Sequence, residues 1–205
     1  MYNTRMMYAI NNFIDENYFL PMKDTYELKE TEDSGKSLLK VTIEGENICV
    51  EEYDKKKRCG FLREAKKFGM QKCIDHFLLK DNGQSWDLYM IEMKSNVGDK
   101  KWRDIKAKMR SSLLNIKALC VFLGITIDHI YTYTTYEKEC FTAPENTADP
   151  KTLLPLFGEK ATNFKRDEWD RNVMKIQIGE NATLSHKAIK MERDDKVGLY
   201  GTLNI

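Results

Sequence analysis

Two acids and a lysine at the centre of this chain are the residues whose types and spacing could do chemistry together. Asp75 stands in the strand-like run Cys73–Lys80, and Glu92 and Lys94 stand in the next such run, Trp86–Lys94. Two carboxylates can share one divalent cation, and a lysine beside them can assist a water molecule or stabilise charge on a phosphate. The trio therefore predicts metal-assisted hydrolysis of a phosphodiester.

A β-hairpin is the element that must position these side chains. The two runs are separated by Asp81-Asn82-Gly83-Gln84, and Asn-Gly between apolar runs is a strong hairpin signal. With the turn centred on Asn82-Gly83, Asp75 pairs with Met90 and lies diagonal to Glu92, within about 7–8 Å. Because side chains alternate between faces along a strand, Glu92 and Lys94 share the face of Asp75. A longer symmetric turn preserves this result, whereas a bulge or a one-residue slip destroys it.

The neighbours of Glu92 make three charged residues unusual at this place. Leu88-Tyr89-Met90-Ile91 is apolar on both faces, which is typical of a central strand covered on both sides. Charged groups are costly there unless they are paired or bound to metal. Oxygen ligands without a cysteine–histidine cluster favour magnesium or manganese. We therefore predict Mg²⁺ or Mn²⁺ held by Asp75 and Glu92, with Lys94 assisting the attacking water.

Alternatives to this interpretation stay open. Glu-x-Lys also occurs at Glu27–Lys29 and at Glu64–Lys66, so the tripeptide alone decides nothing. The trio could be a surface ion-pair cluster at the end of a hairpin, where it would contribute little. Asp87 is a rival first acid, although strand alternation turns it to the face opposite Glu92.

A helix and a strand are predicted to follow the hairpin. Apolar residues recur at spacings of three and four over Asp99–Leu123, and Gly124 is a suitable stop. Ile125–Tyr136 is rich in Ile, Thr and Tyr and reads as a strand. This strand–helix–strand order predicts that the strands on either side of the helix are parallel.

Weaker patterns predict the remaining elements. They indicate a short helix within 3–20, a loop over 21–36, a hairpin of 37–43 with 47–52, a loop over 144–158, a helix within 163–172, and a hairpin of 174–178 with 184–191. We read one domain, with a core over 1–143 and a C-terminal extension of the same domain over 144–205.

Basic and aromatic residues near this core are candidates for nucleic-acid contacts. Lys106 and Arg110 lie four residues apart on the predicted helix and could reach a phosphate near the site. Most other basic residues of that helix read as a solvated face. Tyr131, Tyr133 and Tyr136 could stack on bases, but packing within the strand explains them equally well and is preferred.

Composition bounds the remaining possibilities. The 205 residues are 41% hydrophobic and 32% charged, which suits a globular domain, and the formal net charge of +1 means that nucleic acid must be bound by a local patch. Five scattered cysteines and three histidines predict neither a disulfide scaffold nor a His-rich zinc site, and favour a cytoplasmic location. No apolar run is long enough to predict a membrane span.

The central stretch resembles the PD-(D/E)XK nuclease superfamily, which includes restriction enzymes, junction resolvases and repair and defence nucleases. The matching residues are Cys73-Ile-Asp-His-Phe-Leu-Leu, a short turn, and Tyr89-Met-Ile-Glu-Met-Lys-Ser, followed by a helix and a strand. The resemblance covers about 73–136. It implies an α/β fold with a restriction-endonuclease-like mixed β-sheet flanked by helices, an α-β-β-β-α-β core.

The resemblance also implies roles for residues of the trio, with Asp75 and Glu92 as metal ligands and Lys94 as the catalytic lysine. No proline precedes Asp75, and a further acid that members often carry on the first helix stays unassigned between Asp15 and Glu16. The expected partner is nucleic acid, DNA in preference to RNA, and a homodimer or a larger complex stays open. A non-cleaving nucleic-acid-binding or regulatory protein on this fold, or an interaction domain with an accidental Glu-x-Lys, are the other classes.

Overall fold

The computed structural model describes residues 4–15, 17–30, 36–56, 71–142, 164–178 and 180–205, and over these the protein is a mixed α/β structure. The described helices are α1 (Thr4–Phe13), α2 (Asp99–Leu123) and α3 (Phe164–Asp170), with the short 3₁₀ helix η1 at Tyr53–Lys55. A six-stranded sheet has the order β3 (Asn47–Val50), β4 (His76–Asp81), β5 (Trp86–Glu92), β7 (Ile127–Tyr136), β10 (Glu180–Lys190), β9 (Val173–Ile178). A four-stranded sheet has the order β1 (Thr25–Glu30), β2 (Ser37–Thr42), β12 (Gly198–Asn204), β11 (Glu192–Asp194). The short strands β6 (Asn96–Val97) and β8 (Lys138–Glu139) pair with each other.

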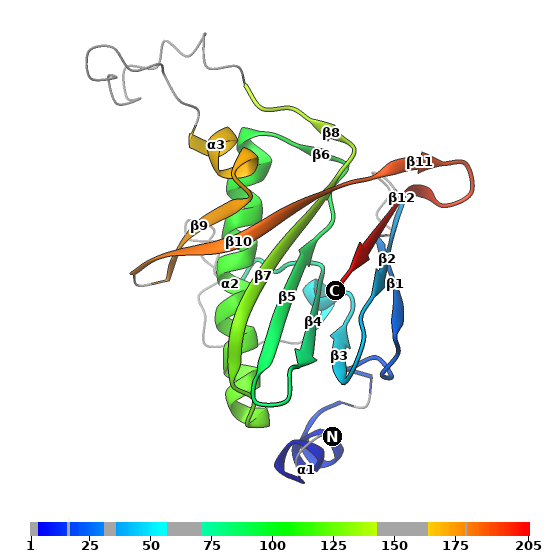
Figure 1. The fold of residues 1–205 in the computed structure, drawn as a ribbon, viewed down its shortest axis with the longest axis vertical. Helices are drawn as coiled ribbons and strands as arrows, with labels where there is room; N and C mark the ends of the chain where they lie inside the picture. The colour runs from blue at the N-terminus through cyan, green and yellow to red at the C-terminus, as the bar shows by residue number, and fades with distance from the viewer. Residues whose placement is uncertain (1–3, 16, 31–35, 57–70, 143–163, 179) are drawn as a thin grey trace.

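The larger sheet lies between α2 and the smaller sheet (Figure 1). Leu88 and Met90 of β5 are buried in the core that contains residues of α2. Tyr89 and Ile91 of the same strand are buried in the core that contains residues of β1 and β2. The prediction that this strand is covered on both sides is confirmed, because each face of β5 packs against a different layer.

The β4–β5 hairpin has the predicted antiparallel pairing but not the predicted register. Phe77 pairs with Met90, and Lys80 pairs with Asp87. The turn is longer than Asn82-Gly83 because side chains close it: Asn82 Oδ1 accepts the N–H of Ser85 at 2.9 Å, and Gly83 has a φ of 94°. The predicted pairing of Asp75 with Met90 is therefore wrong. Continuing the observed ladder by one pair places Asp75 opposite Glu92, still on the same face.

The predicted helix and crossover are confirmed. α2 spans the predicted residues Asp99–Leu123 and ends at Gly124, whose φ of 72° is the left-handed conformation that glycine adopts without strain. β7 then pairs with β5 in the parallel direction. α2 therefore lies on the face of β5 that carries Leu88, Met90 and Glu92.

The predicted hairpin of 37–43 with 47–52 is wrong. β2 pairs with β1 and β12 in the smaller sheet, whereas β3 pairs with β4 in the larger one. The chain changes sheets between them because residues 25–30, predicted as loop, form β1. Tyr26 and Leu28 are buried there and alternate with exposed polar residues, a two-residue period that the acidic composition concealed.

The C-terminal residues add strands to both sheets. The predicted helix within 163–172 and the hairpin that follows it are present as α3 and the antiparallel pair β9–β10. β10 pairs in parallel with β7, while β12, which was not predicted, pairs in parallel with β2. The predicted loop over 144–158 lies outside the described residues. None of the described helices is long and apolar enough to cross a membrane.

Candidate active site

A cavity of about 390 Å³ lies between α2 and the strand ends that carry the predicted trio. Charged side chains dominate its lining, among them Asp75, Glu92, Lys94 and Lys108. Asp75 directly precedes β4, Glu92 is the last residue of β5, and Lys94 lies in the loop after it. The structure thus brings together the three residues that the sequence singled out.

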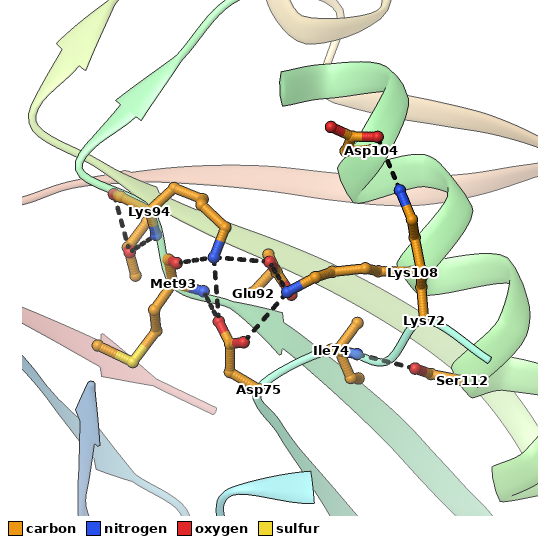
Figure 2. A network of polar contacts seen from close by, with 10 residues as sticks. Lys72, Ile74, Asp75, Glu92, Met93, Lys94, Asp104, Lys108 and Ser112 are labelled. Carbon is orange, nitrogen blue, oxygen red and sulfur yellow. Dashed lines mark hydrogen bonds and ion pairs between the residues drawn. The ribbon is translucent and has the colours of Figure 1, made fainter. Parts of the chain in front are cut away.

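The two carboxylates are buried and each contacts two ammonium groups. Glu92 has no exposed surface, and its Oε1 lies 2.8 Å from Nζ of Lys94 and 2.6 Å from Nζ of Lys108. Asp75 is 5% exposed, with Oδ2 3.6 Å from Lys94 Nζ and Oδ1 3.4 Å from Lys108 Nζ. The lysines approach from opposite sides, one from the loop after β5 and one from α2 (Figure 2). Two positive charges therefore compensate two negative ones, as buried charges require.

Backbone and side-chain hydrogen bonds hold Asp75 in place. Its Oδ2 accepts the N–H of Met93 at 2.6 Å, and its backbone carbonyl accepts the N–H of Tyr53 at 2.7 Å. Just before it, the N–H of Ile74 donates to Oγ of the buried Ser112 on α2 at 2.9 Å. The carboxylate of Asp75 is thus fixed to the residue after β5, while its backbone is held by η1 and, through Ile74, by α2.

The ammonium of Lys94 lies among three oxygen atoms. Nζ donates to the backbone carbonyl of Met93 at 2.6 Å, in addition to its contacts with Glu92 Oε1 and Asp75 Oδ2. The backbone of Lys94 is itself fixed, because its N–H donates to Oγ1 of Thr135 in β7 at 3.0 Å. The place occupied by this ammonium is a position for a cation, built from two carboxylates and one carbonyl.

The electrostatics of the site follow from burial. Burial raises the pKa of Glu92 to about 7, and the charge of Asp75 acts in the same direction against Lys94 and Lys108. Burial opposes the charge of Lys94, but Glu92 and Asp75 outweigh it and raise the pKa of that ammonium. Burial and the nearby Asp75 also raise the pKa of Asp54, an acid of η1 that lines the cavity. Carboxylates are crowded here, and the lysines remain charged.

Two residues of the cavity, Lys108 and Asp54, were not predicted from the sequence as site residues. Lys108 was expected among the solvated basic residues of the helix. It lies three residues after buried Ile105 and four before buried Ser112, so it borders the apolar face. That spacing was the available signal. Asp54 had none, because only the pairing of β3 with β4 brings η1 next to Asp75.

Other candidates lie away from the carboxylates. Lys106 Nζ forms an ion pair with Glu168 of α3 at 2.8 Å, and neither Lys106 nor Arg110 is among the described residues that line the cavity. Asp87 lies near the turn end of β5, where its Oδ1 is 3.1 Å from Nδ1 of His129. A nucleic-acid contact by Lys106 or Arg110 stays a prediction.

The remaining candidates of the sequence analysis also lie outside the cluster. Asp15 accepts the N–H of Asn17, and Glu16 lies outside the described residues, so the first helix supplies no identified acid. Tyr131 stacks on Tyr89 of the neighbouring strand with ring centroids 5.1 Å apart, which agrees with the preferred packing role.

The donors present suit a small divalent cation. Over the described ranges, no group of three His, Cys, Asp or Glu side chains is placed to hold a metal ion, so the donors would be two carboxylates, the Met93 carbonyl and water. Magnesium is commonly bound by one or two carboxylates and several waters. Glu92 Oε2 is buried without a hydrogen-bond partner among the described residues, which leaves one carboxylate oxygen available to such an ion. Searches with this chain found no matching protein-family model, curated protein or solved structure.

Proposed function

We propose that this protein is a metal-dependent nuclease that hydrolyses phosphodiester bonds of nucleic acid. Asp75 and Glu92 would hold Mg²⁺ or Mn²⁺, and Lys94 would assist the attacking water. The observation that carries the proposal is the cation position between Glu92 Oε1, Asp75 Oδ2 and the Met93 carbonyl, which the Lys94 ammonium fills. Hard oxygen donors at the edge of a cavity are what a phosphoryl-transfer metal site needs.

The order of the elements also supports the proposal. Leaving aside β1 and β2 of the smaller sheet and the short β6, α1 is followed by the antiparallel strands β3, β4 and β5, then by α2 and the parallel strand β7. This is the α-β-β-β-α-β order expected of a PD-(D/E)XK nuclease. Asp75 stands at the start of the second of these strands, and Glu92 ends the third. We therefore assign the finer fold, restriction-endonuclease-like, as part of the same proposal.

The reaction proposed is hydrolysis at phosphorus. A water oxygen forms a new bond to phosphorus, the ester P–O bond breaks, and the proton lost by the water is balanced by one gained by the departing oxygen. A bound divalent ion would polarise the phosphate and lower the pKa of the water. Lys94 is an ammonium in this environment, so its contribution is to orient the water and to stabilise negative charge on the phosphate.

A second candidate is a non-cleaving nucleic-acid-binding or regulatory protein on the same fold. The specific observation in its favour is that Lys94 and Lys108 already neutralise Asp75 and Glu92 without any metal. An ion must compete with both lysines to enter. This candidate predicts nucleic-acid binding that neither metal nor these carboxylates influence.

Cleavage assays separate the two candidates. Labelled single- and double-stranded DNA and RNA, DNA first, are incubated with Mg²⁺, Mn²⁺ or EDTA, using wild type, Asp75→Asn, Glu92→Gln and Lys94→Met. The matched control is Asp87→Asn, which removes a carboxylate from the far end of the strand that carries Glu92. We expect metal-dependent cleavage that falls about 100-fold or more in the three site variants and persists in the control. Cleavage of no substrate, with nucleic-acid binding equal in all variants, would favour the second candidate.

A further inference from the structure

Lys108 reaches the carboxylates from the opposite wall of the site. It lies on α2, and its side chain is 24% exposed and faces the cavity between the helix and the strand ends. Its Nζ contacts Glu92 Oε1 and Asp75 Oδ1, so it uses a different oxygen of Asp75 from the one that Lys94 contacts (Figure 2). The two ammonium groups thus mark two cation positions, one on each side of the carboxylate pair.

The charge balance of the cluster changes when a divalent ion binds. With both carboxyls ionised, Asp75 and Glu92 carry two negative charges and Lys94 and Lys108 carry two positive ones, so the metal-free cluster is neutral. An ion of charge +2 leaves a surplus of two positive charges in a region where like charges repel strongly. A phosphodiester carries one negative charge, and hydrolysis adds another at the transition state. The surplus therefore matches the charge that the reacting phosphate acquires.

Lys108 is the lysine that can leave the carboxylates when the ion binds and contact the phosphate. In the proposed function an ion on the Met93 carbonyl displaces the Lys94 ammonium, which then serves the attacking water. The hydrogen bonds of the Lys108 ammonium within the described structure go to Asp75 and Glu92, the groups that the ion would take. Its long, partly exposed side chain lies along the cavity and can turn toward a ligand there without a movement of α2.

We propose that Lys108 is a further active-site residue with two alternative partners. In the metal-free protein it is the counter-ion of Glu92 and Asp75. In the metal-loaded protein it binds a non-bridging oxygen of the scissile phosphate and stabilises the negative charge that develops during hydrolysis. The inference rests on the proposed function, because it needs a divalent ion on the two carboxylates.

Metal binding without nucleic acid tests the first partner. Mn²⁺ is titrated calorimetrically into wild type, Lys108→Met, Lys108→Arg and the control Lys117→Met, which removes an exposed lysine of the same helix. We expect Lys108→Met to bind Mn²⁺ about tenfold more tightly, because the competing ammonium is gone. Lys108→Arg and Lys117→Met should bind Mn²⁺ as the wild type does. Thermal unfolding of each variant confirms that it is folded.

Binding of a fluorescein-labelled DNA duplex tests the second partner. Anisotropy is measured with Ca²⁺ in place of Mg²⁺, to slow cleavage, and again with EDTA. We expect Lys108→Met to weaken binding about tenfold with Ca²⁺ and hardly at all with EDTA. Lys108→Arg should restore most of the loss. Under saturating Mn²⁺, single-turnover cleavage by Lys108→Met should fall about 100-fold, although this variant binds the metal better.

The outcomes separate this inference from the proposed function. A Lys108→Met protein with wild-type Mn²⁺ affinity would show that the lysine does not compete for the carboxylates. Equal loss of DNA binding with Ca²⁺ and with EDTA would show that it contacts DNA regardless of metal. Either result overturns the inference while the nuclease proposal stands. The nuclease proposal itself fails if the wild type does not bind Mn²⁺, or if Asp75→Asn binds Mn²⁺ as tightly as the wild type does. The inference about Lys108 then fails with it.

Discussion

A buried histidine, His186 in β10, makes the stability of the fold depend on pH. The side chain is 2% exposed and packs against Trp102 and Trp169, with ring centroids 4.8 and 5.6 Å away. Nδ1 lies 3.0 Å from Oγ1 of Thr132, and Nε2 is buried without a hydrogen-bond partner among the described residues. Burial lowers the pKa of His186 to about 3, so the folded protein keeps the imidazole neutral.

The size and sign of the effect follow from proton linkage. In the unfolded chain the pKa of a histidine is about 6.5. Because the folded pKa of His186 is below that value, its contribution to stability is complete above about pH 6.5 and is lost as the pH falls toward 3. His186 alone therefore lowers the free energy of unfolding by about 2 kcal/mol at pH 5 relative to pH 8, since each pH unit below the unfolded pKa contributes about 1.4 kcal/mol.

The assay compares His186→Phe, which keeps a planar ring but cannot titrate, with the wild type in urea unfolding at pH 8, 7, 6 and 5. Between pH 8 and pH 5, the unfolding free energy of the variant should fall by about 2 kcal/mol less than that of the wild type. The control is His129→Phe, whose histidine side chain is 59% exposed. Only the change with pH is used, so the lost contact with Thr132 does not matter. Identical pH dependence in wild type and His186→Phe would refute the reasoning.

Further substitutions test how the site and its supports are held. Ser112→Ala removes the acceptor of the Ile74 N–H and should lower the unfolding free energy, measured in urea, by about 1–3 kcal/mol. The same variant should also bind Mn²⁺ more weakly in calorimetry. At Gly98 an added Cβ would lie 2.3 Å from the backbone oxygen of Cys140. Gly98→Ala should therefore lower the thermal midpoint by several degrees, which corresponds to about 1–3 kcal/mol of unfolding free energy. Lys106→Met breaks the partly buried ion pair with Glu168 and should lower the unfolding free energy by about 1–2 kcal/mol in urea, and DNA anisotropy of the same variant tests the predicted phosphate contact.

The central hairpin, helix and strand could be predicted because their signals are local. The apolar residues of α2 recur at helical spacing, and Gly124 supplies the left-handed residue at its end. Asn82-Gly83 marked the turn between β4 and β5. The face shared by Asp75 and Glu92 survived an error in register, because the turn is two residues longer on the side of β5, and a shift of two residues preserves the alternation of side chains.

Strand pairing between distant segments could not be predicted in the same way. β2 lies between β1 and β12, and β12 is near the other end of the chain. The alternation of side chains along a strand can be predicted from the sequence of that strand. Its pairing partner depends on which other strand buries apolar side chains in the same core. The expected hairpin between β2 and β3 failed for this reason, since β2 completes a core with β1 and β12 while β3 joins β4.

Local patterns were enough to predict the common face of Asp75, Glu92 and Lys94, because two adjacent strands and one short turn place these residues together. The contact of Lys108 of α2 with both carboxylates, and the position of Asp54 of η1 in the same cavity, depend on how distant segments pack. A lysine at the edge of an amphipathic helix has the same local pattern whether it faces water or a buried acid. Its charge acquires a partner only when the helix packs on the sheet.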